Sequence, residues 1–268
     1  MIMKTHRQLA SLSVALLAFA TFTSHSAHAA AVLFVGGPVT PSLTDSNIIT
    51  RLQNFGNTVT YVNSAASTTA SAAGQNAVII SSTVPSGEVT NKFADVTIGV
   101  FNWEQALQQQ SRMNFLTEAA ERNSDGAFTQ LTITPGGASS PLAAGLAPGL
   151  YSVTNVAAGF TYGNSVGFGA GATGVALRGD GSGLEANRFG IYGYEAGAIR
   201  PDGTASPGRR VQFFLNDNSF DSLNATGLQL FDAAASYVGA AVPEPSIGAL
   251  AGIGLAALLG SRKRRVRS

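Results

Sequence analysis

Carboxylates and hydroxyl groups must carry any chemistry that this protein performs. The chain of 268 residues contains no cysteine, and its three histidines, His6, His25 and His28, all precede residue 29. If that first segment is cleaved, the remaining chain has no disulfide, no thiolate metal site and no imidazole to carry protons. We therefore expect a protein that is not an enzyme, with no catalytic residue, no metal site and no cofactor.

A tryptophan beside an acid is the first candidate for a ligand site. Trp103, the single Trp of the chain, and Glu104 follow a predicted strand at Val96–Phe101. Open α/β sheets bind ligands beyond the carboxyl ends of their strands, and an aromatic face beside a carboxylate suits a sugar. The alternative interpretation is structural, with Trp103 covering the sheet edge and Glu104 bonded to a nearby loop.

Two further hypotheses assign chemistry to other carboxylates. A secreted glycan hydrolase needs two carboxyl groups about 5 Å or 6.5–9.5 Å apart, for which Glu104 and Glu195 are the candidates. A calcium-stabilised adhesin module needs about six to eight oxygen ligands. Oxygen-rich loops at Asp180–Glu185 and Asn216–Asn218, with Asp221, would supply them. Neither loop fits the EF-hand pattern, so solvated turns are the alternative.

Both ends of the chain have the pattern of targeting segments. Lys4 and Arg7 precede an uncharged apolar run, Leu9–Phe22, and a small-residue stretch, Ser26–Ala30, follows it. This order is typical of a secretory signal peptide cleaved after Ala29. Near the other end, an uncharged run at Ile247–Gly260 is shorter than the roughly 20 residues of a full membrane span.

The segment around that second run resembles a known sorting signal. Its elements are Val242, Pro243, Glu244 and Pro245, the short apolar run, and the basic residues Arg262, Lys263, Arg264, Arg265 and Arg267. In this order they resemble the PEP-CTERM proteins of Gram-negative bacteria. The resemblance implies processing by an exosortase, a transient C-terminal anchor in the inner membrane, and a final place in the cell envelope or outside the cell. It also suggests extracellular polysaccharide as a partner.

Charge supports this division of the chain into a signal peptide (residues 1–29), a body (30–240) and a sorting segment (242–268). The whole chain has a net charge of +1, but the part between the two targeting segments keeps nine basic and fourteen acidic residues, a net charge of −5. Nothing in that part forms a basic stripe. Nucleic acid is therefore not an expected partner.

The first half of the body alternates predicted strands with helical or irregular segments. Ser42 as N-cap, Ile48 and Leu52 on one face, and Gly56 as a stop predict a helix. The turn Gly36-Gly37-Pro38 lacks the pattern of a nucleotide-binding loop and fits a tight strand-to-helix turn. Predicted parallel strands are Ala31–Val35, Thr58–Val62, Ala77–Ser81 and Val96–Phe101. This order predicts an α/β fold with a doubly wound parallel sheet.

The second half of the body is predicted to be rich in β-structure. Short strand candidates are Phe128–Thr134, Gly149–Val153, Ser165–Phe168 and Gly174–Leu177. Phe189–Ala198 and Arg210–Leu215 flank a turn signal at Pro201-Asp202-Gly203 and are expected to pair as a hairpin. A terminal helix is expected to begin after Asn224, its N-cap.

The body as a whole resembles the class I glutamine amidotransferase-like superfamily, in its non-catalytic branch. The resemblance is carried by Val32–Val35 with Gly36-Gly37, Ala77–Ile80, Phe101–Glu104, Pro141–Gly145 and Arg209–Phe214. It implies a flavodoxin-like sheet. Active members place a nucleophilic cysteine after a central strand, where this chain has Asn102-Trp103-Glu104. The resemblance therefore implies the fold without the amidotransferase activity.

Overall fold

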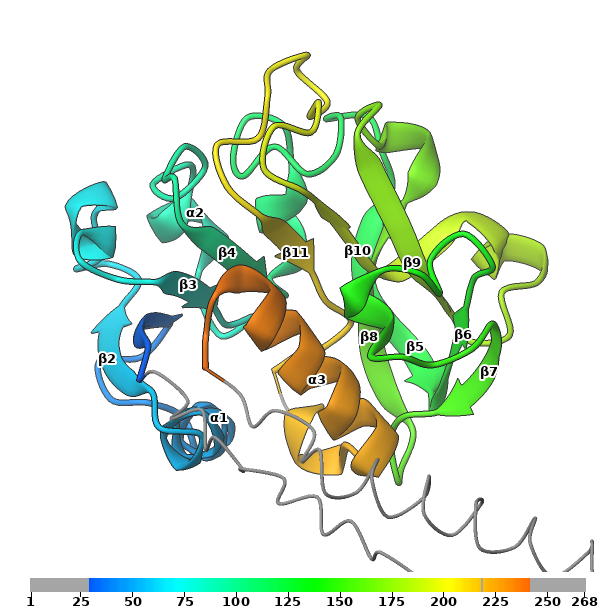
Figure 1. Cartoon of the computed structure of the whole chain (residues 1–268), viewed down its shortest axis with the longest axis horizontal. Helices are drawn as coiled ribbons and strands as arrows, with labels where there is room; N and C mark the ends of the chain where they lie inside the picture. The colour runs from blue at the N-terminus through cyan, green and yellow to red at the C-terminus, as the bar shows by residue number, and fades with distance from the viewer. Residues whose placement is uncertain (1–28, 218, 242–268) are drawn as a thin grey trace, which may run out of the picture.

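A mixed sheet of eleven strands organises residues 29–217 and 219–241, the part of the chain that the computed structural model describes (Figure 1). Its main path runs β2-β1-β3-β4-β11-β10-β9-β6-β7, and β8 pairs with β10 and β5 beside this path. The strands are β1 (Ala31–Gly36), β2 (Thr58–Asn63), β3 (Ala77–Ile80), β4 (Gly99–Asn102), β5 (Arg122–Phe128), β6 (Gln130–Ile133), β7 (Gly149–Ser152), β8 (Ala158–Asn164), β9 (Ala172–Arg178), β10 (Arg188–Tyr194) and β11 (Arg210–Gln212).

The α-helices of the described chain are few. They are α1 (Leu43–Asn54), α2 (Ser86–Val89) and α3 (Ala225–Val238). The Ser42 side chain caps α1 by accepting from the Asp45 amide, and Asn224 caps α3 in the same way from Gly227. Both caps are those expected from the sequence, because each side chain satisfies an N–H that the first helical turn leaves unpaired.

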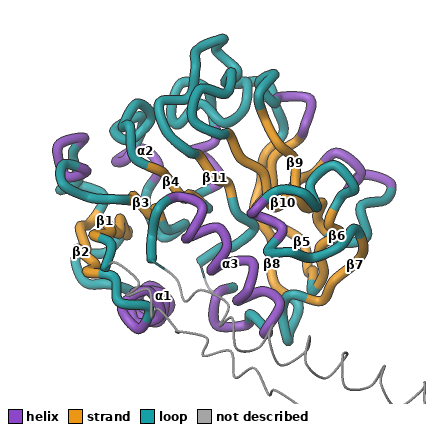
Figure 2. Tube along the Cα trace, in the orientation of Figure 1, coloured by secondary structure: helices purple, strands orange, loops and turns teal. Residues whose placement is uncertain are grey.

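The two faces of the parallel half are covered differently. On one face, Ile48 of α1 and Phe231 of α3 join Phe34 and Phe101 of the strands in one hydrophobic cluster. On the other face, the single turn of α2 and irregular segments between residues 84 and 120 pack on strand side chains such as Val78. Figure 2 shows how few of the covering segments are helical. The sheet is thus wound with regular helices on one face and mainly with loops on the other.

The four predicted strands of the first half are confirmed as parallel neighbours. β1 lies between β2 and β3, and β3 pairs with β4, all in parallel register. The fourth strand is shorter than predicted and begins at Gly99. The reason is Arg210. Its guanidinium donates hydrogen bonds to the carbonyl oxygens of Ala94, Val96 and Ile98, so these residues do not pair with a neighbouring strand.

The sheet becomes antiparallel after β11, so the prediction of a parallel sheet holds for one half only. β11 is parallel to β4, whereas β10 is antiparallel to β11, with Tyr192 opposite Gln212 and Tyr194 opposite Arg210. The expected hairpin between these segments is therefore confirmed. Its partners β9, β6 and β7 extend the antiparallel half.

Two details of the predicted β-rich half are wrong. Ser165–Gly167 is a 3₁₀ helix rather than a strand, because the Asn164 side chain accepts from the Val166 amide and turns the chain. The predicted strand Phe128–Thr134 is divided between the end of β5 and β6. Strand β8 was not predicted, since its glycines conceal the alternation that marks a strand.

Both ends of the described body lie at the amino edge of the parallel strands. The Ala30 carbonyl accepts from the Thr58 amide at 2.9 Å. Asn57, one residue earlier, binds Ala241 twice: its Oδ1 accepts from the Ala241 amide at 2.7 Å and its Nδ2 donates to the Ala241 carbonyl at 2.8 Å. Ala30 and Ala241, the described residues next to the two predicted junctions, are therefore bound to consecutive residues, Thr58 and Asn57. The expected signal peptide, except Ala29, and the sorting segment lie outside the described residues.

Candidate functional site

A polar cleft of about 570 Å³ opens at the carboxyl edge of the parallel strands. Ser82 follows β3, Glu104 follows β4, and Asn216 and Asp217 come after β11, so three neighbouring strands contribute to it. This is the edge at which open α/β sheets bind ligands. The described lining residues are Ser82, Glu104, Gln105, Ser124, Val156, Ala157, Ala158, Gly159, Thr161, Asn216, Asp217, Ser219 and Ser222.

Buried amide side chains hold Glu104 in place. Asn102, at the end of β4, donates through Nδ2 to Gln212 Oε1 at 2.6 Å and to the Glu104 carbonyl at 3.0 Å. Its Oδ1 accepts from the Glu104 amide at 3.3 Å. Both amide residues are fully buried. The turn from β4 into the cleft is therefore fixed by side chains of the two adjacent parallel strands.

The Glu104 carboxyl group is nearly enclosed, with 8% of the residue exposed. Its Oε1 accepts from the Ala106 amide at 3.0 Å, which caps the short 3₁₀ helix Gln105–Gln108. Burial raises the pKa of Glu104 to about 7, and the charge of Asp217 raises it further, while the Ala106 hydrogen bond and Arg112 act in the opposite direction. The group is thus close to half-protonated at neutral pH.

Trp103 lies behind the cleft and does not line it. Its ring is 1% exposed and meets Phe101 edge-on, with ring centroids 5.1 Å apart, and packs against Phe34 and Phe231. A ring enclosed in this way offers no face to a sugar. Of the predicted ligand pair, only Glu104 reaches the cleft, and Trp103 has the structural place that the alternative interpretation gave it.

One wall of the cleft is the β5–β8 ribbon, which carries Ser124, Ala158, Gly159 and Thr161. Thr161 joins this wall to the sheet: its amide donates to the Phe214 carbonyl at 2.8 Å, and its hydroxyl donates to the Leu215 carbonyl at 2.6 Å. Because the ribbon lies beside the main path of the sheet, these bonds set the width of the cleft.

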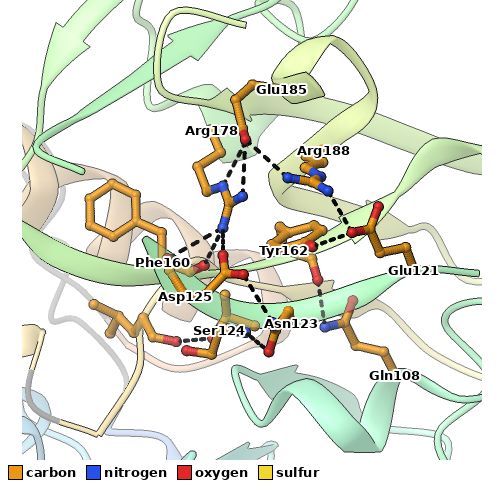
Figure 3. A network of polar contacts seen from close by, with 12 residues as sticks. Gln108, Glu121, Asn123, Ser124, Asp125, Phe160, Tyr162, Arg178, Glu185 and Arg188 are labelled. Atoms are coloured by element: carbon orange, nitrogen blue, oxygen red, sulfur yellow. Dashed lines mark hydrogen bonds and ion pairs between the residues drawn. The ribbon is translucent and has the colours of Figure 1, made fainter. Parts of the chain in front are cut away.

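A buried arginine, Arg178, binds both strands of the β5–β8 ribbon (Figure 3). Arg178, at the end of β9, is 2% exposed and is paired with Asp125 of β5 and, in a bidentate manner at 2.7 and 3.0 Å, with Glu185. It also donates to the Phe160 carbonyl of β8 at 3.3 Å. The guanidinium lies 4.0 Å from the Tyr162 ring centroid. One side chain therefore ties both strands of the cleft wall to β9.

A further group of charges surrounds Tyr162. Its hydroxyl donates to Glu121 Oε1 at 2.9 Å, and Arg188 binds the same carboxylate while its guanidinium lies 4.8 Å from the ring. Arg188 also pairs with Glu185 at 3.2 Å. Figure 3 shows these groups converging from different strands. The carboxylates Glu121 and Glu185 are thus both paired with arginines.

The predicted hydrolase pair is wrong, because Glu104 and Glu195 lie at opposite edges of the sheet. β10 is antiparallel to β11, so Glu195 follows Tyr194 at the amino edge of β4 and β11, five strand positions from Glu104, or roughly 16 Å. Glu195 is bound there by Arg209 at 3.0 Å.

The oxygen-rich loops do not converge as a calcium site would. Asp180 accepts from Ser182, Glu185 is held by two arginines, and Asp221 accepts from Thr44 and Asn47. Asn218 lies outside the described residues. Within the described ranges, no three His, Cys, Asp or Glu side chains form a group that could hold a metal ion.

The Gly36-Gly37 turn is closed by side-chain hydroxyls. The Gly37 amide donates to Thr83 Oγ1 at 3.1 Å, and Thr83 and Ser81 both donate to the buried Asp45. A Cβ at Gly37 would lie 1.9 Å from the Thr83 carbonyl oxygen, so only glycine permits this approach. A tight turn beside a carboxylate, as observed, is unsuited to phosphate.

Sequence reasoning missed the grouping of Asp217 with Glu104. The sequence pattern indicated Asp217 only as part of an oxygen-rich loop. A signal was present, since both acids follow strands with the expected parallel-sheet character, and the carboxyl ends of parallel strands meet at one edge. Ser82 had the same signal, since it follows β3. Ser124 and Thr161 of the lining had none, because their positions depend on the docking of the β5–β8 ribbon.

The C-terminal part of the chain is similar to a known family in sequence. Residues 241–265 match the PEP-CTERM protein-sorting motif. The chain carries a PEP-CTERM sorting signal. The matched range includes the predicted motif Val242–Pro245 and the basic residues 262–265, and Arg267 lies beyond it. The motif implies an exported protein of the cell envelope or exterior, with a transient membrane-anchored state and an exosortase as its processing partner.

No curated protein matches the chain in sequence. Among solved structures, a protein described as a GMP synthase subunit, from Thermoplasma acidophilum, matches with 13% identity and a TM-score of 0.49, over 78% of this chain and 96% of its own. PurLQS from Thermotoga maritima matches with 11% identity and a TM-score of 0.43, over 78% and 99% of the two chains.

The structure has no membrane-crossing helix in residues 29–217 and 219–241: none there combines the required length with the required apolar character. The predicted hydrophobic sorting helix falls in the segment that is not described.

The buried Arg178 is expected to dominate the stability of the cleft wall. Replacing it with methionine keeps the volume but removes the ion-pair partner of Asp125 and one of the two partners of Glu185, so Arg178→Met should lower the free energy of unfolding by about 1–3 kcal/mol. Arg209→Met removes an exposed pair, in which Arg209 and Glu195 are 50% and 54% exposed, and should cost about 1 kcal/mol or less. Chemical denaturation measures both. Equal losses in the two variants would contradict the role given to Arg178.

The raised pKa of Glu104 predicts a loss of stability as pH increases. The folded-state pKa of about 7 exceeds the ordinary value of 4.5, so between these values the folded chain binds more protons than the unfolded chain. This group's contribution is full below pH 4.5 and is lost by about pH 7, a change of about 3 kcal/mol. Glu104→Gln should therefore raise the melting temperature more at pH 8 than at pH 5.

Glu195→Gln, an exposed change of the same charge at the opposite edge, serves as the control. If the two variants change the melting temperature equally at both pH values, Glu104 does not titrate as described.

Proposed function

We propose that this protein is displayed at the cell surface or in an extracellular polysaccharide matrix as a non-catalytic binding domain, with the Glu104 cleft as its ligand site. The observation that carries the proposal is the position of the cleft. It opens at the carboxyl edge of the parallel strands, whereas Ala30 and Ala241, next to the two processing junctions, are bonded at the amino edge.

Chain length strengthens this arrangement before processing. Ala241 is clamped to Asn57, and the apolar run of the sorting segment begins at Ile247. Six residues span at most about 20 Å even when fully extended. The amino edge of the sheet is thus held near the membrane while the chain is anchored. The cleft, at the carboxyl edge, then faces away from the membrane.

The composition of the cleft supports binding rather than catalysis. Its described lining consists mainly of hydroxyl, amide and small apolar side chains, with no Lys and two acids. The body also contains no Cys or His. Sites without a nucleophile and its base lack the parts that acyl transfer requires. A cleft of about 570 Å³ with many polar groups is in the size range of small-molecule and glycan-unit sites.

A second candidate function is a carboxylate-dependent glycan hydrolase. It is favoured by one observation, the presence of Glu104 and Asp217 in the same cleft, where Asp217 contributes to the raised pKa of Glu104. A carboxyl group with a raised pKa in the same cleft as a second acid is the arrangement that glycosidases use. The pair differs from the one expected from the sequence, since Asp217 takes the place of Glu195.

Binding to matrix polymer tests the proposed function. The processed protein, collected from the surface of the producing cells, should sediment with isolated matrix polysaccharide. Glu104→Gln and Asp217→Asn should each weaken this retention by about tenfold, because each removes a charged acceptor. Glu195→Gln should leave it unchanged. Retention that is insensitive to both cleft variants would overturn the binding role, and release of new reducing ends that Asp217→Asn abolishes would favour the hydrolase.

Processing at both ends is a separate expectation. The intact mass of the surface protein should correspond to a chain that begins at or near Ala30 and lacks the basic residues 262–267. Replacing Pro243 and Glu244 together by alanine should leave the basic end attached and the protein in the membrane fraction. Recovery of the full-length chain from the extracellular material of unaltered cells would contradict this expectation.

A further inference from the structure

The cleft is acidic, and its acids have no counter-charge within the described chain. Glu104 and Asp217 line it, and no Lys, Arg or His is among the described lining residues. Neither acid has an ion-pair partner in the part of the chain that is described. Arg112 acts on Glu104 only from a distance, and its guanidinium donates to the Ala106 carbonyl at 3.2 Å. A carboxylate that is more than nine-tenths buried and uncompensated is costly for the free protein.

Glu104 also keeps an oxygen for a ligand. Its Oε1 accepts from the Ala106 amide, and within the described residues its other oxygen has no hydrogen-bond partner. Two hydroxyl groups of the lining, Ser82 Oγ and Ser124 Oγ, are buried without a partner in the same part of the structure. The cleft thus has a free charged acceptor and free hydroxyls on separate walls. Groups of this kind, left unpaired, would be satisfied by a ligand that carries both donors and acceptors.

The described lining of the cleft contains no aromatic side chain. The apolar part of its described lining is Val156, Ala157 and Ala158, and Trp103 is enclosed behind it. Recognition by stacking on a sugar ring is therefore absent from this part of the site. Charge and hydrogen bonds must supply the binding energy instead, and the negative charge of the cleft excludes anionic sugars.

We propose that the cleft binds a protonated amine carried on a polyhydroxylated ligand, with Glu104 and Asp217 pairing with the ammonium group and the serine hydroxyls bonding its neighbouring hydroxyls. This inference rests on the proposed binding function and names its ligand class. A polymer of amino sugars has this chemistry. A divalent cation fits less well, because no third acidic or imidazole ligand accompanies the two carboxylates among the described residues.

Two oligosaccharides matched in length isolate the charge. Calorimetry with the processed protein from the cell surface would compare a hexamer of glucosamine with the hexamer of N-acetylglucosamine, which has the same ring hydroxyls and no charged amine. The acetylated hexamer should bind about 10- to 100-fold more weakly, the range expected for loss of a charge-assisted contact. Glu104→Gln should reduce binding of the glucosamine hexamer by a similar factor, and Glu195→Gln should not.

Spermidine and Ca²⁺ complete the comparison. Spermidine supplies amines without hydroxyls and should bind at least about tenfold more weakly than the glucosamine hexamer. Equal affinity for spermidine, or tighter binding of Ca²⁺, would overturn the ligand class. Equal affinity for the two hexamers, both dependent on Glu104, would overturn the amine while leaving the cleft as a glycan site. Binding of the glucosamine hexamer that is unaffected by Glu104→Gln would overturn both this inference and the proposed site.

Discussion

The burial of one guanidinium group is the constraint on which the rest of the site depends. Arg178 is removed from water at the end of β9 and must therefore be neutralised and hydrogen-bonded on all sides. Asp125 and Glu185 supply the negative charge, and the Phe160 carbonyl accepts a further hydrogen bond. Through these bonds Arg178 holds the β5–β8 ribbon, which joins the sheet where β8 pairs with β10, and the ribbon forms one wall of the cleft.

The change from parallel to antiparallel pairing at β11 decides what each edge of the sheet does. Strands β2, β1, β3, β4 and β11 all point the same way, so residues of the cleft lie at their carboxyl ends, and Ala30 and Ala241 lie at their amino ends. β10 runs in the other direction and carries Glu195 away from the cleft. A domain tethered at one edge and open at the other suits display on a surface.

The polar cleft and the Arg178–Arg188 charge network next to it differ in whether their charged side chains form ion pairs. Around Arg178 and Arg188, each guanidinium is paired with two carboxylates. Glu104 has no ion-pair partner within the described residues, and its burial raises its pKa to about 7. Natural proteins retain such unfavourable groups mainly where they serve a ligand or a reaction. This contrast within about one strand's width distinguishes the site from the scaffold.

Local patterns in the sequence were sufficient for the first half of the fold and for the sorting signal. The apolar runs of β1 and β3, the Ser42 and Asn224 caps and the Val242–Pro245 motif are all formed from residues that are close together in the chain, and Glu104 was found because it follows a strand. Tertiary structure alone decided which residues share a cleft. Trp103 is buried by Phe34 and Phe231, which are distant in sequence. Arg178 binds Asp125, which precedes it by 53 positions. The direction of β10 separated Glu195 from Glu104, because pairing direction is set by long-range packing that no short stretch of sequence encodes.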